Sequence, residues 1–314
     1  MKGPWDERPY HSLDWELRRL YGKKLYKLSL NGGMSCPNRD GSKGTGGCIF
    51  CSGGGSGEFA SGAALSVKEQ LAAAKELVKK KLPRRAPGGY IAYFQAYTNT
   101  YGPLPLLERL FTEAMDDDEV EILSVATRPD CLPGEVVNLL SRLNRRKPVW
   151  VELGLQTIHE KTAGWIRRGY PLSCFDDAAR RLEGAGIPVT AHVILGLPGE
   201  GRKELLETID HLNRLRIWGV KLQLLHILSG TGLEEPFRAG KVRALSFEEY
   251  EELLFSAIAR LRPETVIHRI TGDGPKKLLL APLWSGNKRE VLNRLSRDMK
   301  AAGLLQGMDF KEEV

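Results

Sequence analysis

Three cysteines lie close together in one short, glycine-rich stretch of this 314-residue chain. Eleven residues separate Cys36 from Cys48, and two more separate Cys48 from Cys51. Two close cysteines with a third upstream can surround one metal centre, because thiolates bind both zinc and iron–sulfur clusters. The surrounding glycines let the backbone turn sharply and bring N–H groups near the sulfurs. The spacing therefore predicts a metal site formed by these three cysteines.

Two kinds of metal site compete for these ligands. A structural zinc ion takes four protein ligands, and the loop contains no histidine and no fourth cysteine. Three thiolates on a cluster of four irons would leave one iron open to another ligand. The ligand count favours a redox-active iron–sulfur cluster, with zinc and a distant fourth ligand as the alternative. Cys131 and Cys174 stand apart, and we interpret them as small buried side chains.

The elements that must position this loop alternate along the chain. Strand patterns occupy residues 24–30, 90–95, 119–126, 148–154, 188–195, 219–227 and 264–270. Helical spacing occupies residues 13–22, 66–81, 104–115, 133–144, 174–185, 201–215, 246–261 and 287–304. Such alternation requires parallel strands with right-handed helical crossovers. We expect an α/β fold, either a partial or full (β/α) barrel or an open doubly wound sheet, with functional groups at the carboxyl ends of the strands.

The cysteine loop resembles the cluster motif of the radical SAM (S-adenosylmethionine) superfamily, in which an aromatic residue precedes the third cysteine, as Phe50 does here. The commonest gap between the first two cysteines is shorter in that superfamily. The gap of eleven residues is similar to the branch that contains the elongator catalytic subunit and the bacterial MnmL group, which modifies tRNA wobble uridine. Residues 93–101, 126–130, 152–156 and 192–200 also resemble that branch.

This resemblance covers about residues 15–280. It implies one radical SAM domain over residues 1–314, with residues 281–314 as a C-terminal helical extension. It also implies that Cys36, Cys48 and Cys51 hold a [4Fe-4S] cluster that cleaves SAM reductively, and that the resulting radical removes a hydrogen atom from the substrate. No catalytic residue is assigned beyond the cluster ligands.

The resemblance places the SAM contacts after the second, fourth and fifth strands. The residues concerned are Gln95, Tyr97, Thr98, Glu152, Gln156, Gly196 and Pro198. The first three would line the methionine moiety, the next two would bind the ribose, and the backbone of the last two would contact adenine. A carboxylate in an apolar strand is costly unless it is paired, so an internal salt bridge is the alternative role of Glu152. Arg128 and Asp130 are expected to pair with each other.

The composition describes a globular chain, with 42% hydrophobic and 27% charged residues. No apolar run is long enough to span a bilayer, and the N-terminus has no apolar signal-peptide core. We therefore expect a cytoplasmic protein with no membrane partner. The net charge of +7 includes three short basic clusters: residues 23–27, 79–85 and 142–147. Each cluster alone is typical of a solvated helix end or loop, but their sum favours a polyanionic partner such as RNA.

The leading functional hypothesis is a radical SAM enzyme that acts on tRNA. For the MnmL-like group, the implied step converts a carboxymethylaminomethyl group on the wobble uridine to an aminomethyl group. The electron would come from a flavodoxin- or ferredoxin-type donor. Two alternatives stay open: a radical SAM enzyme with a small-molecule substrate, and a zinc-stabilised RNA-binding module that is not an enzyme.

Overall fold

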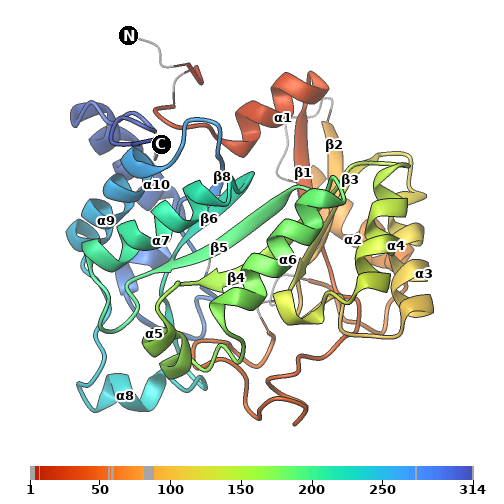
Figure 1. Cartoon of the computed structure of the whole chain (residues 1–314), viewed down its shortest axis with the longest axis horizontal. Coiled ribbons are helices and arrows are strands. Elements are labelled where there is room, and N and C mark those ends of the chain that lie inside the picture. The colour runs from red at the N-terminus through yellow and green to blue at the C-terminus, as the bar shows by residue number, and fades with distance from the viewer. Residues whose placement is uncertain are drawn as a thin grey trace.

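A computed structural model describes residues 4–6, 8–55, 57, 60–80, 88–272 and 274–312. In this part of the chain the main sheet consists of β1 (Lys24–Leu30), β2 (Gly88–Phe94), β3 (Val120–Thr127), β4 (Val149–Gln156), β5 (Val189–Leu195), β6 (Gly219–Leu224) and β8 (Val266–Arg269) (Figure 1). The longer helices are α1 (Leu13–Tyr21), α2 (Val67–Lys79), α3 (Leu104–Met115), α4 (Gly134–Asn144), α6 (Leu172–Gly184), α7 (Arg202–Arg214), α9 (Phe247–Arg260) and α10 (Lys288–Ala301).

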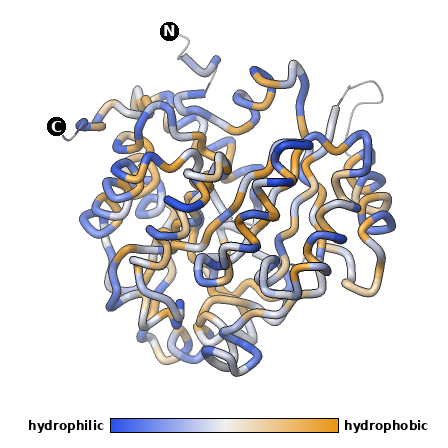
Figure 2. Tube along the Cα trace, turned by 45° about the vertical axis from the view of Figure 1, so that its right-hand side comes forward, coloured by the Kyte–Doolittle hydropathy of each residue, from blue (hydrophilic) through white to orange (hydrophobic). Residues whose placement is uncertain are grey.

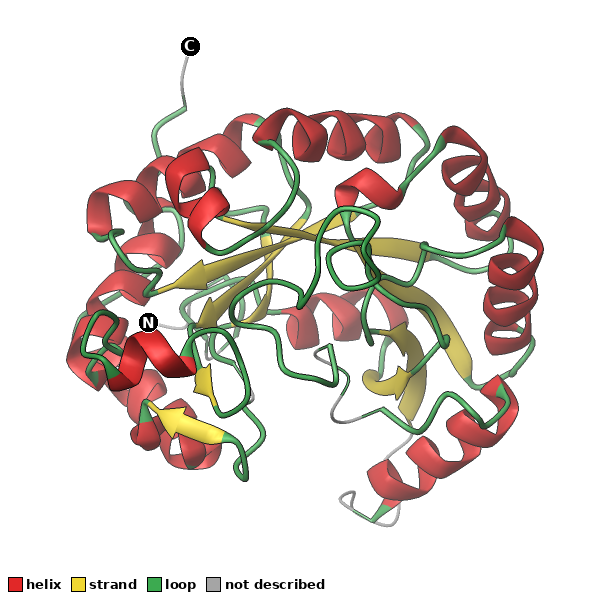
Figure 3. Cartoon of the chain, turned by 90° about the horizontal axis from the view of Figure 1, so that it is seen from below, coloured by secondary structure: helices red, strands yellow, loops and turns green. Residues whose placement is uncertain are grey.

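The strands of the main sheet are all parallel and lie in the order β1–β2–β3–β4–β5–β6–β8. Neighbours in the sheet are therefore consecutive along the chain, whereas a doubly wound sheet reverses its strand order at a switch point. The sheet curls into a half-barrel, and the helices form an arc outside it (Figure 3). The expected partial (β/α) barrel is confirmed, and the doubly wound alternative is wrong.

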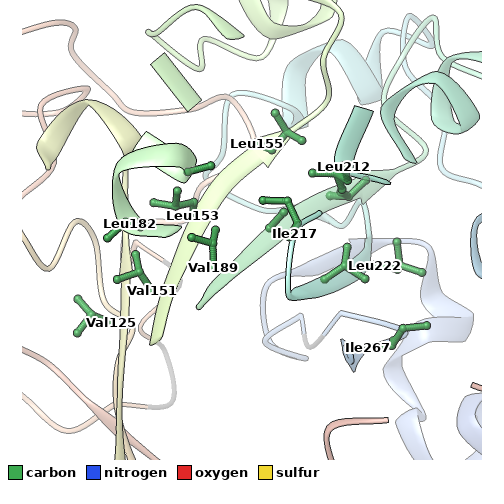
Figure 4. Close-up of a cluster of buried hydrophobic side chains, with 14 of the residues drawn as sticks. Val125, Val151, Leu153, Leu155, Leu182, Val189, Leu212, Ile217, Leu222 and Ile267 are labelled. Carbon is green, nitrogen blue, oxygen red and sulfur yellow. The ribbon is translucent and has the colours of Figure 1, made fainter. Parts of the chain in front are cut away.

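The outward-facing strand residues form the main hydrophobic core beneath the helices. Val125, Val151 and Leu153 are fully buried there, together with Leu182 of α6 and Leu212 of α7 (Figure 4). Each buried aliphatic side chain contributes about 1.5–3 kcal/mol relative to an exposed one. Hydrophobic colouring follows the central strands and hydrophilic colouring the outer turns of the helices (Figure 2). This apolar layer holds the helices against the convex face of the sheet.

The other strand residues point into the barrel and form layers. At the amino ends, Leu25, Ile91, Ile122 and Trp150 form an apolar cluster with Leu17 of α1. Two residues further along the same four strands the layer becomes polar, with Lys27, Tyr93, Ser124 and Glu152. Because side chains alternate in direction, both layers face the same interior space. Apolar side chains therefore close the barrel at the amino ends of its strands, and charged groups lie directly above them.

Strands β1 and β8 are the two edges of the main sheet, and α1 packs against both of them. The segment before α1 pairs with β8, where the N–H of Ile267 donates to the carbonyl of His11 at 2.7 Å. The N–H of His11 in turn donates to Oε1 of Gln306 at 2.8 Å. The gap between the sheet edges is thus bridged at the amino ends of the strands.

Several short elements differ from the sequence prediction. The helices α5 (Glu160–Trp165) and α8 (Glu234–Arg238), the antiparallel pair β7 (Ile227–Leu228) and β9 (Leu279–Ala281), and the 3₁₀ turns η1 (Pro129–Cys131) and η2 (Leu283–Gly286) were not expected. Each is too short to show a hydrophobic period. The predicted strand over 219–227 ends at Leu224, and the chain turns before β7.

The remaining observations concern the start of α2, the C-terminal helix and the search for membrane spans. Ser66 and Glu69 form a capping box at the start of α2, while Lys81, Arg84 and Arg85 of the basic cluster lie outside the described residues. Helix α10 packs into the main core through three buried side chains: Val291, Leu295 and Met299. The division into a core and a C-terminal extension stays a prediction. Among the described residues, no helix is both long enough and apolar enough to cross a membrane.

Candidate active site

The cysteine loop lies at the carboxyl ends of the strands, directly after β1. Cys36, Cys48 and Cys51 are half-buried, form no disulfide, and all line one cavity of about 280 Å³. The N–H of Cys51 donates to the carbonyl of Cys48 at 3.0 Å, which closes a tight turn between them. Gly47 has a φ of +81°, and an added Cβ would lie 2.8 Å from Nε of Arg39. The turn thus needs glycine, as the sequence indicated.

Asn38 holds the loop against the segment that joins α5 to α6. Its side-chain nitrogen donates to the carbonyls of Arg167 and Arg168 at 2.7 and 3.0 Å, and it lies 3.5 Å from the sulfur of Cys48. The approach is close, because a Cβ on Gly169 would lie 2.4 Å from Oδ1 of Asn38. A single buried amide therefore connects the cluster loop to the far side of the barrel mouth.

Positive charge surrounds the thiols. The pKa of Cys48 is lowered to about 7, first by a hydrogen bond from Cys51 and then with help from Asn38, Arg128 and Arg39. The pKa of Cys51 is raised, chiefly because it is the partner in that bond. Thiolate is the form that binds a metal. The surroundings therefore favour a ligating form at Cys48.

The donor set fits an iron–sulfur cluster by its chemistry. All three thiols face one cavity, and N–H donors and guanidinium groups lie beside them. Among the described residues, no three His, Cys, Asp or Glu side chains are arranged to hold a single metal ion. A cluster binds each thiolate through a different iron, so its ligands do not have to converge on one atom.

The predicted contacts after β2 do reach the cavity. Gln95, Tyr97 and Thr98 all line it. Tyr97 adopts the left-handed conformation, with φ of +58°, and its hydroxyl donates to the carbonyl of Gly53 at 2.6 Å. A Cβ on Gly55 would lie 2.4 Å from the Tyr97 ring. Tyr97 therefore also packs the cysteine loop against the end of β2, a role that the sequence did not reveal.

Arg128 and Asp130 pair as expected. Two parallel hydrogen bonds of 2.9 and 2.8 Å join the guanidinium to the carboxylate. Lys43 from the cysteine loop adds a second ion pair to Asp130 at 2.7 Å. Burial alone would raise the pKa of Asp130, but its bonds to Arg128 and Lys43 lower it. Arg128 also lines the cavity, so this pair fixes a cation at the mouth.

Glu152 lies within β4 and inside the barrel, where it is fully buried. Its Oε1 accepts from Lys27 at 2.7 Å and from Ser124 at 3.1 Å. Its Oε2 accepts from Lys221 and, at 2.9 Å, from Nε2 of His192. The alternative of an internal salt bridge is confirmed, and both oxygens are occupied by protein donors. The expectation that Glu152 binds ribose stays a prediction.

The charges in this polar layer shift one another. Burial would raise the pKa of Glu152, but the charges of Lys221 and Lys27 outweigh it, and the pKa lies well below its usual range. Burial lowers the pKa of Lys221 to about 7 and that of His192 to about 4. His192 is therefore neutral near pH 7 and donates to Glu152 from Nε2.

The bulge at the end of β4 brings Gln156 to the cavity. The pairing register with β5 shifts between Gly154 and Gln156, and Gln156 has a φ of +64°. A Cβ on Gly154 would lie 2.6 Å from Nε2 of Gln156 and 3.0 Å from the hydroxyl of Tyr170. The side chains of Gln156 and Tyr170 therefore approach the backbone closely at Gly154.

Gly196 and Pro198 are not among the described residues that line the cavity. Gly196 has a φ of +89°, and a Cβ there would lie 2.9 Å from the side chain of Leu245. Glycine at position 196 therefore allows the left-handed backbone and the close packing of Leu245. The contact with adenine stays a prediction.

Three cavity residues of the inner layers were missed: Tyr93, Lys221 and Gln223. Arg269 of β8 also lines the cavity. The available signal was a charged residue at an alternating position of an otherwise apolar strand, as at Lys27 and Lys221. Lys27 had been grouped with Lys23 and Lys24 as a basic surface cluster, and the structure corrects this. Its ammonium points into the barrel because its strand position has the same parity as Leu25.

Comparison with protein-family models gives two matches. The radical SAM superfamily model matches residues 40–212, which is more than half of the chain, and the radical SAM C-terminal domain model matches residues 217–301. The chain belongs to the radical SAM superfamily. Membership implies that this radical SAM protein is an enzyme that uses SAM and an iron–sulfur cluster, in agreement with the cysteine loop.

This radical SAM chain is similar in sequence to curated relatives and in structure to solved proteins. It is 42% identical to the uncharacterized protein YtqA of Bacillus subtilis over 305 residues, which covers 97% of this chain and 94% of the relative. It is 25% identical to human Elongator complex protein 3 over 205 residues, covering 64% of this chain and 36% of that protein. The archaeal Elp3 structure from Methanocaldococcus infernus matches with a TM-score of 0.68 at 16% identity, covering 90% of this chain and 64% of that one. The last match confirms the fold.

Proposed function

We propose that this radical SAM enzyme holds a [4Fe-4S] cluster on Cys36, Cys48 and Cys51 and modifies a wobble-uridine side chain of tRNA in the cytoplasm. The observation that supports the cofactor is that three thiols, and cationic groups beside them, line one cavity at the carboxyl ends of parallel strands. Bound together, a cluster and SAM supply a carbon radical that can remove a hydrogen atom from an unactivated C–H bond.

Within the cavity, we assign SAM to the mouth. Gln95, Thr98 and Gln156 present amide and hydroxyl groups there, and Arg39 and Arg128 lie near the thiols. Arg39 suits the carboxylate of SAM, because a guanidinium binds a carboxylate bidentately, whereas the nitrogens of Arg128 already donate to Asp130 and to the carbonyl of Arg168. These side chains would bind and orient SAM. Glu152 is left out of this set because its oxygens are already occupied.

The proposed conversion changes a carboxymethylaminomethyl group to an aminomethyl group. Two electrons leave the methylene carbon beside the carboxylate, and water adds to that carbon, so the products are the aminomethyl group and glyoxylate. The same two electrons reduce SAM to methionine and 5′-deoxyadenosine, and the reaction balances. A flavodoxin- or ferredoxin-type protein would supply only a priming electron, and the second electron lost by the substrate would replace it at the end of each turnover.

Charge around the cavity supports a polyanionic substrate. Lys276 and Lys277 are exposed and directly follow Pro275, which lines the cavity. Arg167 is also exposed, and its carbonyl accepts from Asn38 of the cysteine loop. Lysine and arginine at the rim would contact phosphates without reading sequence. By contrast, Arg142 and Arg146 pair with Glu108 and Asp116, so that basic cluster offers less free charge.

The cofactor is tested by anaerobic purification and metal analysis. We expect a brown protein with about four irons per chain. Cys36→Ala, Cys48→Ala and Cys51→Ala should each lose most of the iron, whereas Cys174→Ala is the matched control and should retain it. A colourless protein with one zinc would contradict the radical SAM reading of the loop and leave the zinc-stabilised module.

The substrate is tested by mass spectrometry of tRNA nucleosides from a deletion strain. We expect carboxymethylaminomethyluridine to accumulate and the aminomethyl product to disappear. An unchanged wobble profile would remove the tRNA proposal and favour a small-molecule substrate. Purified enzyme should bind tRNA with an affinity that falls steeply with salt, and Lys276→Ala with Lys277→Ala should reduce the slope by about 1–2.

A further inference from the structure

The cavity has a marked excess of positive charge in its interior. Among the described residues that line it, Glu152 is the only carboxylate, against Arg39, Arg128, Lys221 and Arg269. The first two arginines lie at the mouth near the thiols, where Arg128 pairs with Asp130. Lys221 and Arg269 line the same cavity from within β6 and β8. They belong to the polar layer above the apolar cluster at the amino ends of the strands, and the iron–sulfur cluster does not account for them.

Two lysines share one carboxylate in that layer. The ammonium of Lys27 binds Oε1 of Glu152 and that of Lys221 binds Oε2, so the lysine pair (Lys27 and Lys221) has one positive charge more than its partner. Lys221 is 4% exposed, and its ammonium also donates to the hydroxyl of Tyr93 at 3.0 Å. A buried charge that exceeds its counter-charge is unfavourable unless a ligand balances it. The excess is therefore the kind of feature expected of an anion site.

We propose that Lys221 binds a carboxylate of the substrate inside the barrel, with Glu152 as a positioning residue that holds the ammonium groups of the lysine pair. The proposal deepens the proposed function and rests on it for the identity of the substrate. A carboxylate held by Lys221 would place the neighbouring methylene carbon between the polar layer and the cysteine loop. This is the carbon from which the proposed reaction removes hydrogen.

A monocarboxylate fits this site better than a phosphate. An ammonium has three donors, and two of those of Lys221 are taken by Glu152 and Tyr93, so one donor is left for one carboxylate oxygen, whereas a phosphate monoester brings three acceptor oxygens and nearly two charges. The carboxylate of SAM is a poor candidate because the thiols and Arg128 lie at strand ends, while Lys27 and Lys221 lie within β1 and β6. Burial lowers the pKa of Lys221 to about 7, and a bound anion would restore its charge.

The experiment measures binding to the reconstituted holoenzyme with SAM present, by calorimetry at pH 7. The probes are 5-carboxymethylaminomethyluridine and its neutral amide, which differ only in the charged group. We expect the carboxylate to bind the wild-type enzyme roughly 10- to 100-fold more tightly than the amide, the size of one charged hydrogen bond. Lys221→Met should abolish this preference while the affinity for SAM stays unchanged.

Two further variants keep the test decisive. Lys24→Met removes a half-exposed lysine of β1 that lies 4.0 Å from Asp14, and it should leave the preference intact. If Lys221→Met does not fold, Lys221→Gln keeps a hydrogen-bond donor for Glu152 without the positive charge and should also lose the preference. Equal affinity for both probes, an unchanged preference in the variants, or loss of SAM binding in Lys221→Met would overturn the proposal.

The outcome also separates the two proposals. If neither nucleoside binds but N-benzylglycine does, in a manner that depends on Lys221, then the carboxylate site stands and the uridine substrate falls. If tRNA is modified in vivo but the carboxylate preference is absent, then the proposed function stands and the lysine pair has another role.

Discussion

The side-chain nitrogen of Asn38 lies 3.5 Å from the sulfur of Cys48 while it donates to two backbone carbonyls, those of Arg167 and Arg168. One residue thus joins a ligand of the proposed cluster to the α5–α6 connection, about 130 positions away in sequence. The relationship makes the stability of the loop and the durability of the cluster depend on the same amide.

Asn38→Ala should weaken both properties. It leaves two carbonyls without a donor, which costs about 1–3 kcal/mol each when no water replaces it. We expect a lower denaturant midpoint and faster loss of iron in air. Asn144→Ala is the matched control, because Asn144 also donates to a carbonyl, that of Gly186 at 3.1 Å, but far from the loop. Equal iron loss in both variants would contradict the prediction.

Gly55→Ala should displace the cysteine loop. The new Cβ would lie 2.4 Å from the Tyr97 ring, and Gly55 has a φ of +57°. Overpacking of this kind costs about 1–3 kcal/mol. We expect weaker SAM binding by calorimetry. Gly53→Ala is the control, since nothing lies within 4 Å of an added Cβ. The prediction fails if Gly53→Ala is the more damaging change.

Glu152→Gln should destabilise the folded protein strongly. It keeps the shape of the side chain but leaves the lysine pair without its counter-charge, and breaking a buried pair in this way costs about 3–5 kcal/mol. Urea unfolding at pH 7 measures the loss. Adding Lys221→Met should recover part of it, because the variant then has one buried cation fewer. A Glu152→Gln protein as stable as wild type would show that the layer is already balanced without the carboxylate.

Lys221 should give anion binding a pH dependence. Its pKa is lowered from 10.5 to about 7, so the folded protein holds fewer protons than the unfolded chain between these values. Its contribution to stability therefore improves as pH rises through that window. Binding has the opposite sign, because the ammonium that attracts a carboxylate is lost above about pH 7.

We expect the affinity for the carboxylate nucleoside to fall by about tenfold per pH unit above 7. Lys221→Arg should flatten the profile, since arginine stays protonated. The groups that face Lys221, and whose titration must be considered with it, are Lys27 of β1, Tyr93 of β2, Glu152 of β4, His192 of β5 and His268 and Arg269 of β8. The same slope in Lys221→Arg would assign the dependence to another of these groups.

The main strands and longer helices could be predicted because their periods are long enough to read. Alternation in β1 or β6 shows that Lys27 and Lys221 share a face with other residues of the strand, but not which face. In an open sheet that face would lie under helices, and only closure of the half-barrel turns it into an interior. The position of the lysine pair inside the barrel could therefore not be predicted before the sheet order was known.

The candidate site divides along the same line. The three cysteines are local in sequence, and so is the glycine-rich turn that presents them. Arg128 and Asp130 are two positions apart, and their pairing could be predicted for the same reason. The side chains that donate hydrogen bonds to Glu152 come from β1, β3, β5 and β6, and no local sequence pattern contains them. Gln156 was found by its motif, but its left-handed backbone depends on the bulge beside β5.

The contact of His11 with both β8 and Gln306 has a mechanical consequence. Edge strands that do not pair with each other can drift apart, and here α1 packs against both of them, while the hydrogen bonds of His11 hold the segment before α1 to β8 and to Gln306. The spacing of Lys27 on β1 from its neighbours on β6 and β8 therefore depends on a helix that contributes no residue to the cavity lining. Weakening the contacts of α1 with β1 and β8 would widen the barrel without changing any side chain inside it.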